Sequence, residues 1–286
     1  MLKAIIDIGS NSVRMLLERD GKPVEKALIT TRLGENKKDG FLCEKSSLRT
    51  LNGIKELIIK AKNAGADEIY AFATAAVRNA VNGKEFVGKV KEYCGIDVDV
   101  LSGEREAAIG AAGALCGADG GVIDIGGGST EIAVVSGGAP IYSVSIPYGA
   151  VNLTDKFGQN AAAIKDFMRE EVKKFGSVPK ARFYAIGGTA TSLAGISLKL
   201  NEYSSEKVNG CKFIKTDIDR ITEEICLKTP DGRKKAYGSL QKERADIIHA
   251  GACILQAVTD YLGAVDITVS ESDNLEGYSA YLAGKL

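Results

Sequence analysis

The sequence has a single histidine, His249, and no two cysteines in C-x-x-C spacing. A serine–histidine or cysteine–histidine mechanism needs a histidine within a catalytic arrangement, and one histidine in a predicted helix does not supply it. We therefore expect His249 to be packed or solvent-facing. The cysteines also lack zinc spacing, which indicates reduced thiols in a cytoplasmic protein. They are Cys43, Cys94, Cys116, Cys211, Cys226 and Cys253.

Net charge and long apolar runs are missing as well. Lys plus Arg and Asp plus Glu each number 37, so the chain has no overall basic field and a nucleic-acid partner is disfavoured. An anionic substrate must then be held by local groups. No apolar run approaches the roughly 18 residues of a membrane span, and the chain begins directly with a predicted strand. We expect no membrane partner and no export signal.

Residues 121–136, GVIDIGGGSTEIAVVS, combine an apolar strand, a glycine loop and two carboxylates. Asp124 interrupts the strand, where a buried charge without a partner costs several kcal/mol, about 3 or more. The glycines at 126–128 leave backbone N–H groups uncovered, which suits the close approach of a phosphate. Glu131 follows on the next strand. Two carboxylates beside phosphate-binding amides predict a magnesium or manganese site for phosphoryl chemistry.

A second stretch, AIIDIGSNSVRMLL at residues 4–17, repeats this pattern. Three positions agree at a constant offset of 117: Asp7 with Asp124, Gly9 with Gly126, and Ser12 with Ser129. The agreement predicts an internal duplication in which two glycine hairpins face each other across a cleft. Asp7 would join the metal site directly or through water. The alternative, two ordinary glycine hairpins, leaves the buried aspartate of both unexplained.

Further motifs follow in a fixed order. They are ATAAVRNA (73–80), LSGEREA (101–107), IPYGAVNLT (146–154), AIGGTATSLAG (185–195), KERADIIHAGACIL (242–255) and SESDNLEGY (270–278). Together with the loop pair DIGSNSVR and DIGGGSTE, they resemble the exopolyphosphatase and guanosine pentaphosphate phosphatase family. That family lies within the superfamily of actin and the sugar kinases. The resemblance spans nearly the whole chain.

The resemblance implies an α/β fold of two duplicated ribonuclease-H-like lobes, as in actin-like ATPases, around a central cleft. Residues 1–117 and a returning segment, 272–286, would form the first lobe, and residues 118–271 the second. The implied activity is release of terminal phosphate from inorganic polyphosphate or guanosine pentaphosphate. The substrate partner is then a small or polymeric polyphosphate anion. A homodimer is a candidate assembly.

The motif at residues 101–107 carries the implied catalytic acid. In the family pattern SG-x-EEA the second acid is catalytic, which assigns the role to Glu106. Arg105 replaces the first acid, and we expect it to favour the ionised form of Glu106 and to add a phosphate contact. Glu104 and Glu106 also complement the dipole at the start of a helix, so a purely structural role stays open.

Substrate binding is assigned to a larger set. Arg78 matches a substrate-contacting arginine of the family, and its fork can bind phosphate bidentately, although a surface arginine on a short helix is the alternative. Glycines between a strand and a helix, at 187–188, form either an anion site or a tight turn. The full set is Gly9, Ser10, Asn11, Ser12, Arg14, Arg78, Gly126, Gly127, Gly128, Ser129, Thr130, Gly187, Gly188, Thr189 and Arg244. Lys37 and Lys38 are either polyanion contacts or part of a solvated loop.

Apolar spacing predicts the remaining elements. Strands are expected at residues 2–8, 13–19, 24–33, 68–73, 97–101, 141–146, 182–186 and 267–270. Helices are expected at 46–64, 103–114, 160–175, 217–228 and 242–262, and one at 274–283 that closes back onto the first lobe. The small residues of 107–114 should let another element approach closely.

Two other functions stay open at this point. A kinase or ATPase of the same superfamily would need an acceptor pocket, whereas the match at Glu106 indicates water as the acceptor. A non-catalytic sensor of polyphosphate or nucleotide is disfavoured by the acids Asp7, Asp124 and Glu131.

Overall fold

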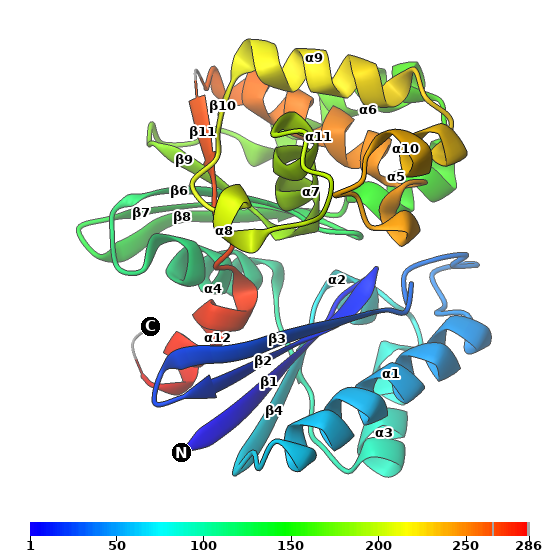
Figure 1. Ribbon diagram of the computed structural model, residues 1–286, viewed down its shortest axis with the longest axis vertical. Coiled ribbons are helices and arrows are strands. Elements are labelled where there is room, and N and C mark those ends of the chain that lie inside the picture. Colours follow the sequence, from blue (N-terminus) through cyan, green and yellow to red (C-terminus); the bar gives the residue numbers. More distant parts are fainter. Residues whose placement is uncertain (265, 285–286) are drawn as a thin grey trace.

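The structure, a computed structural model, describes residues 1–264 and 266–284. In this part of the chain, two β-sheets form the centres of two lobes (Figure 1). The first sheet has the order β3-β2-β1-β4-β5, and its strands are Leu2–Ile8 (β1), Ser12–Arg19 (β2), Lys22–Thr30 (β3), Glu68–Ala73 (β4) and Asp99–Val100 (β5). The second sheet has the order β10-β11-β9-β6-β7-β8. Its strands are Gly120–Ile125 (β6), Thr130–Ser136 (β7), Ala139–Ile146 (β8), Phe183–Ile186 (β9), Lys212–Ile214 (β10) and Asp266–Val269 (β11).

The two sheets repeat one topology. Strand β1 pairs antiparallel with β2 and parallel with β4, and β6 pairs in the same way with β7 and β9. The predicted duplication is therefore confirmed, with β10 added antiparallel to β11 at one edge. Val265 and residues 285–286, which belong to the two predicted lobes, lie outside the described residues. The lobe limits at 117/118 and 271/272 stay a prediction.

Helices cover the outer face of each sheet (Figure 1). In α1, Leu51, Ile54, Leu57 and Ile58 form one buried stripe at helical spacing, as expected for an amphipathic helix. The helices are Glu44–Asn63 (α1), Ala75–Arg78 (α2), Gly83–Cys94 (α3), Gly103–Leu115 (α4), Ala150–Phe157 (α5), Ala161–Glu171 (α6), Gly187–Ser197 (α7), Ser205–Val208 (α8), Lys215–Cys226 (α9), Pro230–Ala236 (α10), Ile248–Leu262 (α11) and Asn274–Leu282 (α12). Among the described helices, none combines the length and the apolarity needed to cross a membrane.

Helices α4 and α12 pack against each other between the two sheets (Figure 1). A Cβ atom added to Gly113 would collide with the carbonyl oxygen of Asp273, and one added to Gly277 would collide with that of Ile109. The predicted close approach at the small residues of α4 is confirmed. The ring of Tyr278 in α12 stacks on Phe72 of the first sheet, with 4.6 Å between the ring centroids.

Two predicted elements differ from the structure. Residues 31–33 leave the strand predicted at 24–33, because the N–H groups of Thr31 and Arg32 both donate to the carbonyl of Asn11. The helix predicted at 242–262 is interrupted between a short 3-10 turn, Lys242–Arg244, and α11. The carbonyl groups of Glu243, Ala245 and Asp246 in this region accept hydrogen bonds from side chains far away in the chain. The donors are Arg32, Arg233 and Gln159, and their bonds compete with the hydrogen bonds of a continuous helix. The helix α3 was not predicted.

The states of the cysteines and of the histidine are those expected from the sequence. All six cysteines are free thiols. His249 is fully buried, and its Nε2 lies 2.9 Å from the carbonyl oxygen of Gly158. His249 is therefore a packed residue.

Candidate active site

The two glycine loops close their hairpins in the same way. The N–H of Gly9 donates to the carbonyl of Ser12, and that of Gly126 to the carbonyl of Ser129, both at 3.0 Å. The loops also lie against each other. A Cβ atom on Gly127 would come within 2.8 Å of the Cβ of Ser10. The loops therefore face each other across the cleft, as predicted, and only a glycine fits at residue 127 without displacing the opposite loop.

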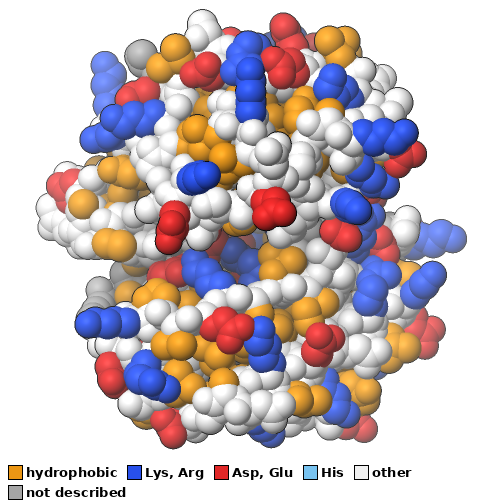
Figure 2. Space-filling view, in the orientation of Figure 1, with side chains coloured by type: hydrophobic (Ala, Val, Ile, Leu, Met, Phe, Trp, Pro, Cys, Tyr) orange, Lys and Arg blue, Asp and Glu red, His pale blue; other side chains and the backbone are white. Residues whose placement is uncertain are grey.

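Both loops line one cavity of about 80 Å³ between the lobes. The acids Asp7, Glu106 and Asp124 contribute to its wall. Predicted substrate-binding residues line it as well, namely Gly9, Ser10, Asn11, Ser12, Arg14, Gly126, Gly127, Gly128, Ser129, Gly187, Gly188, Thr189 and Arg244. The face shown in Figure 2 is hollowed between the lobes, with acidic and basic side chains in the hollow.

The two hairpins differ at one decisive position. In the first, Arg14 lies directly opposite Asp7, and its Nε donates to Asp7 Oδ2 at 3.0 Å. In the second, the corresponding pair is Asp124 opposite Glu131. The first hairpin thus neutralises its own acid, whereas the second brings two acids together. The negative charge of the site is concentrated in the second lobe.

Burial and mutual repulsion disfavour ionisation of the acids around the cavity. Desolvation raises the pKa of Glu106 to about 7, and desolvation together with the nearby Asp273 raises that of Asp124 to about 6. Desolvation, followed by repulsion from Glu106 and Asp124, raises the pKa of Glu131 well above its ordinary value. Desolvation also raises the pKa of Asp7. A bound cation would relieve this repulsion.

These acids suit a hard cation in charge and donor type. Two buried carboxylate oxygens, Asp7 Oδ1 and Glu131 Oε2, have no hydrogen-bond partner among the described residues. Across residues 1–264 and 266–284, however, no three acidic, histidine or cysteine side chains already converge as a metal cage. Magnesium usually takes one or two carboxylates together with water and substrate phosphate, so an incomplete protein cage is compatible with it.

Glu106 and Arg78 form an ion pair beside the cavity. Arg78 donates to Glu106 Oε2 at 2.5 Å and to the carbonyl of Leu101 at 3.0 Å, and its other terminal nitrogen lies 3.9 Å from Glu131 Oε1. Glu106 is 5% exposed, whereas Glu104 in the same helical turn is exposed. The geometry places Glu106, and not Glu104, at the cavity.

Three predicted site residues do not line the cavity directly. Arg78 and Glu131 are not part of its wall, and a terminal nitrogen of Arg78 lies 3.9 Å from Glu131 Oε1. Thr130 is fully buried and its hydroxyl donates to the carbonyl of Tyr148 at 2.7 Å. That hydroxyl therefore supports the turn after β8 and does not face the cavity.

Arg105, for which we expected a phosphate contact, does not line the cavity. Arg105 instead pairs bidentately with Asp99, at 3.1 and 2.8 Å, and lies over the ring of Tyr281. Burial raises the pKa of Glu106 and the neighbouring Arg78 lowers it, so the effect expected of Arg105 on Glu106 stays a prediction. Lys37 was left open between two roles. Its ammonium donates to the carbonyl of Ala76 at 3.0 Å, so it is fixed on α2, and Lys38 is exposed.

The strand–turn–helix at residues 186–189 lies at the side of the same cavity. Gly187 adopts φ +79°, and a Cβ there would come within 2.7 Å of Asp124 Oδ1. The guanidinium of Arg244 lies so close to Gly188 that a side chain at residue 188 would displace it. Desolvation, with repulsion from Arg14, lowers the pKa of Arg244 to about 10, which indicates a guanidinium in need of an anion.

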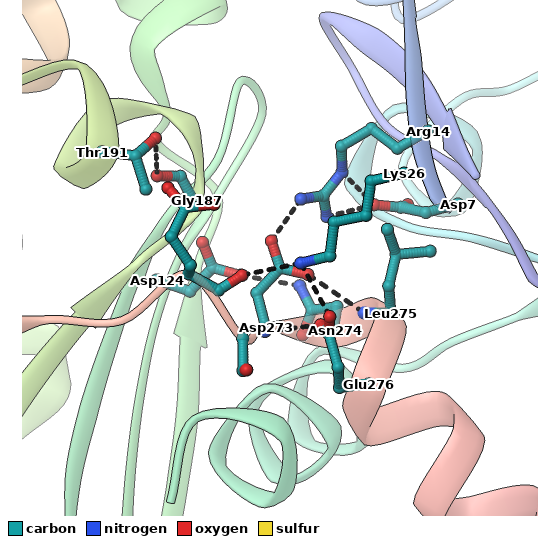
Figure 3. Close-up of polar contacts among 12 residues, drawn as sticks. Asp7, Arg14, Lys26, Asp124, Gly187, Thr191, Asp273, Asn274, Leu275 and Glu276 are labelled. Carbon is teal, nitrogen blue, oxygen red and sulfur yellow. Dashed lines mark hydrogen bonds and ion pairs between the residues drawn. The ribbon is translucent and has the colours of Figure 1, made fainter. Parts of the chain in front are cut away.

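Sequence reasoning missed the contribution of the start of α12. Figure 3 shows Arg14 between Asp7 and Asp273, and Asn274 reaching Asp124. The Nδ2 of Asn274 donates to Asp124 Oδ2 at 2.8 Å. Asp273 and Asn274 belong to the motif SESDNLEGY, which was the available signal. A sequence does not reveal that they meet Arg14 and Asp124, each more than a hundred residues away.

Comparisons with known proteins agree with this geometry. The model of the Ppx/GppA phosphatase family matches residues 18–280. The chain is 32% identical to the bifunctional 3-dehydroquinate synthase/phosphatase of Fusobacterium nucleatum, over 96% of this chain but 46% of that protein, so it spans about half of that relative's length. It is also 32% identical to exopolyphosphatase 1 of Mycobacterium bovis, over 90% of this chain and 81% of that protein.

A solved structure shows the fold. The crystal structure of the Aquifex aeolicus member of the Ppx/GppA family superposes with a TM-score of 0.81 at 29% identity, covering all of this chain and 98% of that one. The expected α/β fold of two actin-like lobes is confirmed. The chain belongs to the Ppx/GppA phosphatase family.

Proposed function

We propose that the chain hydrolyses phosphoanhydrides and releases the terminal phosphate of inorganic polyphosphate, guanosine pentaphosphate or both. The observation that carries this proposal is the meeting of two glycine loops and the buried acid Glu106 at one cavity. The name exopolyphosphatase, borne by relatives of similar sequence, supports it.

The reaction in this proposal is a single in-line attack of water on phosphorus. Phosphoryl transfer demands mainly positioning and neutralisation of charge. Backbone N–H groups of the glycine loops bind the non-bridging oxygens, while Gly188 and Arg244 hold a more distant part of the substrate. Glu106 orients the water and accepts its proton. With a pKa of about 7, Glu106 is partly ionised near neutral pH and suits a general base.

Arg78 and the acids of the second hairpin complete the proposed site. Arg78, held beside Glu106, neutralises charge that develops toward the leaving phosphate. Asp124 and Glu131 would hold Mg²⁺ or Mn²⁺, with Asp7 directly or through water. When bound, such an ion neutralises phosphate oxygens.

One assay separates this proposal from a kinase and from a non-catalytic sensor. Phosphate release is measured from polyphosphate and from guanosine pentaphosphate side by side, with magnesium, with manganese and with a chelator. We expect metal-dependent release from at least one substrate. Binding without release would favour a sensor, and transfer of phosphate to an added hydroxyl acceptor in place of water would favour a kinase.

The same assay with Asp124→Asn tests the metal assignment. We expect the metal dependence to be lost while the variant remains folded, as judged by thermal unfolding. Full metal-dependent activity in this variant would refute the role of Asp124. Metal binding itself is followed by calorimetry in the absence of substrate, which distinguishes lost binding from lost chemistry.

A further inference from the structure

The space between the two glycine loops is narrow. The cavity that the loops line measures about 80 Å³, and it adjoins a second cavity of about 300 Å³ on the side of Arg14, Gly187 and Arg244. The glycine loops that form the walls of the smaller cavity touch, since Ser10 lies against Gly127 and Gly128. A phosphate can therefore lie between the two loops only if the lobes move apart, and the contacts that hold the lobes together must then break and form again.

Arg32 makes a bidentate polar contact across the open side of the cleft. Its terminal nitrogens donate bidentately to Asp246, at 2.8 and 2.9 Å, and one of them also donates to the carbonyl of Glu243 at 2.6 Å. Nearby, the N–H of Asn36 donates to Asp155 at 3.2 Å. The loop that carries Arg32, between β3 and α1, lies on the opposite side of the molecule from the packed helices α4 and α12 (Figure 1). The helix pair can act as the hinge, and the Arg32 contacts lie where opening begins.

On the first lobe, Arg32 is coupled to the phosphate loop through the backbone. The N–H groups of Thr31 and Arg32 donate to the carbonyl of Asn11 at 3.0 and 2.8 Å, and that of Gly34 donates to the carbonyl of Ser10 at 2.8 Å. Arg32 itself adopts φ +51°, a conformation that costs a non-glycine residue energy unless its surroundings impose it. The side chain of Arg32 is thus aimed across the cleft by the loop that binds phosphate.

On the second lobe, Asp246 is coupled to the turn that carries Arg244. Gln159 donates to the carbonyl of Asp246 at 2.8 Å. The buried side chain of Arg233 donates to the carbonyl of Ala245 at 3.0 Å. These bonds fix the break before α11, and Arg244 at its start lines the cavity. The pair Arg32–Asp246 therefore joins two backbone segments that each present a substrate-binding group.

We propose that the Arg32–Asp246 ion pair is a clasp that holds the cleft closed and sets the alignment of the first phosphate loop with Arg244. Both residues are positioning residues, since neither lines the cavity. The role in turnover rests on the proposed function, whereas the role in closure does not. The side chains are 31% and 34% exposed, so the clasp is weak enough to open and close repeatedly.

Hydrogen exchange tests closure without any substrate. In Asp246→Asn, the amides of residues 9–12 and 126–129 should exchange up to about fivefold faster, because a partly exposed ion pair contributes at most about 1 kcal/mol to closure. The matched control is Glu224→Gln, which removes a pair with Arg220 at 2.9 Å within the single helix α9. We expect no change at the loops in the control. Unchanged exchange in folded Asp246→Asn would overturn the clasp.

Kinetics test the alignment. Asp246→Asn and Arg32→Lys should lower kcat/KM for the better substrate by up to about fivefold, because the alignment that the ion pair supplies is worth at most about 1 kcal/mol. The exchanged pair Arg32→Asp with Asp246→Arg should recover most of the loss, because the ion pair is restored. Asp at residue 32 also tolerates a positive φ. A double variant no better than either single change would refute the pairing.

The two arms fail independently. Faster loop exchange in a protein that hydrolyses neither substrate would leave the clasp intact and remove the proposed function. Hydrolysis of either substrate, with unchanged hydrogen exchange of the loops in Asp246→Asn, would remove the clasp and leave the proposed function intact.

Discussion

At the scale of single residues, burial separates two glutamates that look equivalent in the sequence. Glu104 and Glu106 both lie in the first turn of α4, but only Glu106 is buried and paired with Arg78. A helix-dipole role would apply to both of them equally. The pair therefore offers a matched comparison for the catalytic assignment.

Replacing Glu106 by Gln should lower kcat by about 10²–10⁴, the usual contribution of a general base, with nearly normal substrate binding. Glu104→Gln should remain within about twofold of the unchanged protein, since Glu104 is exposed. Steady-state kinetics and substrate-binding measurements on both variants check this. Near-normal turnover in folded Glu106→Gln would remove it from the mechanism.

The raised pKa values of the site acids predict a pH dependence. A general base must be ionised, and the pKa values of Glu106 and Asp124 are raised to about 7 and about 6. Activity should therefore rise with pH, and kcat/KM should show an acid limb whose apparent pKa lies above the ordinary glutamate value and, because bound metal relieves repulsion among the acids, below about 7. A pH series at saturating metal measures it. An acid limb near the ordinary glutamate pKa would contradict the burial argument.

His249 predicts a separate effect on stability. Its burial lowers the pKa of the imidazole to about 4. Between about pH 6.5 and pH 4 the unfolded chain therefore binds a proton that the folded chain does not bind. The contribution, on the order of 3 kcal/mol, is complete above about pH 6.5 and is lost as the pH falls toward 4. Because the chain has one histidine, NMR can follow its ring directly. Titration near pH 6.5 in the folded protein would refute the prediction.

At the scale of elements, the crossing of α4 and α12 depends on glycine. A methyl group on Gly113 has no room, because the opposing atom is a backbone carbonyl oxygen, that of Asp273, which cannot rotate away. The small residues of α4 and α12 are buried against each other, and α4 also packs on β6, β7 and β8. The closeness of this crossing is what brings Asn274 to Asp124.

Gly113→Ala should therefore lower the free energy of unfolding by about 3 kcal/mol or more, at the upper end of the overpacking range. The matched change is Gly88→Ala in α3, where a Cβ would meet nothing within 4 Å. The free energy of unfolding of that variant should rise by up to about 1 kcal/mol, because alanine has a higher helix propensity than glycine. Urea unfolding of both variants checks the pair, and similar effects of the two changes would contradict the packing argument.

Elements whose signals are local were predictable from the sequence. The glycine hairpins and the small-residue face of α4 are specified by neighbouring residues, and both were found as expected. The break before α11 was not, because the donors that capture its carbonyls, Arg32, Gln159 and Arg233, lie far away in the chain. The ion pair of Arg105 with Asp99 was not predicted either, although Asp99 is only 6 residues away, because Asp99 precedes the helix and no helical or strand spacing links the two.

At the scale of the whole molecule, the two lobes share part of their cores. Ile109 of α4 packs with Ile5, Leu16 and Phe72 of the first sheet, and other residues of the same helix pack on the second sheet. Removing either lobe would expose apolar surface on α4. The lobes are thus two halves of the site but are not two independent folding units.

We therefore expect a single cooperative unfolding transition. In urea, far-UV circular dichroism and the hydrogen exchange of peptides from β1 and β6 should report the same midpoint. Two separable transitions, with one sheet protected while the other exchanges, would show that the shared helices do not couple the lobes. The clasp variant Asp246→Asn serves as a control, because opening the cleft should leave the two probes with one shared midpoint even where that midpoint shifts.

The stack of Tyr278 on Phe72 has a consequence for the order in which the protein matures on the ribosome. Phe72 is translated about 200 residues before its partner, which at about 5–20 residues per second means a wait of about 10–40 s. During that interval the inner face of the first sheet lacks its covering helix, while every strand and outer helix of the second lobe has already been made. The lobe that is encoded first is then completed last, and its uncovered face is the surface that a chaperone would meet on the nascent chain.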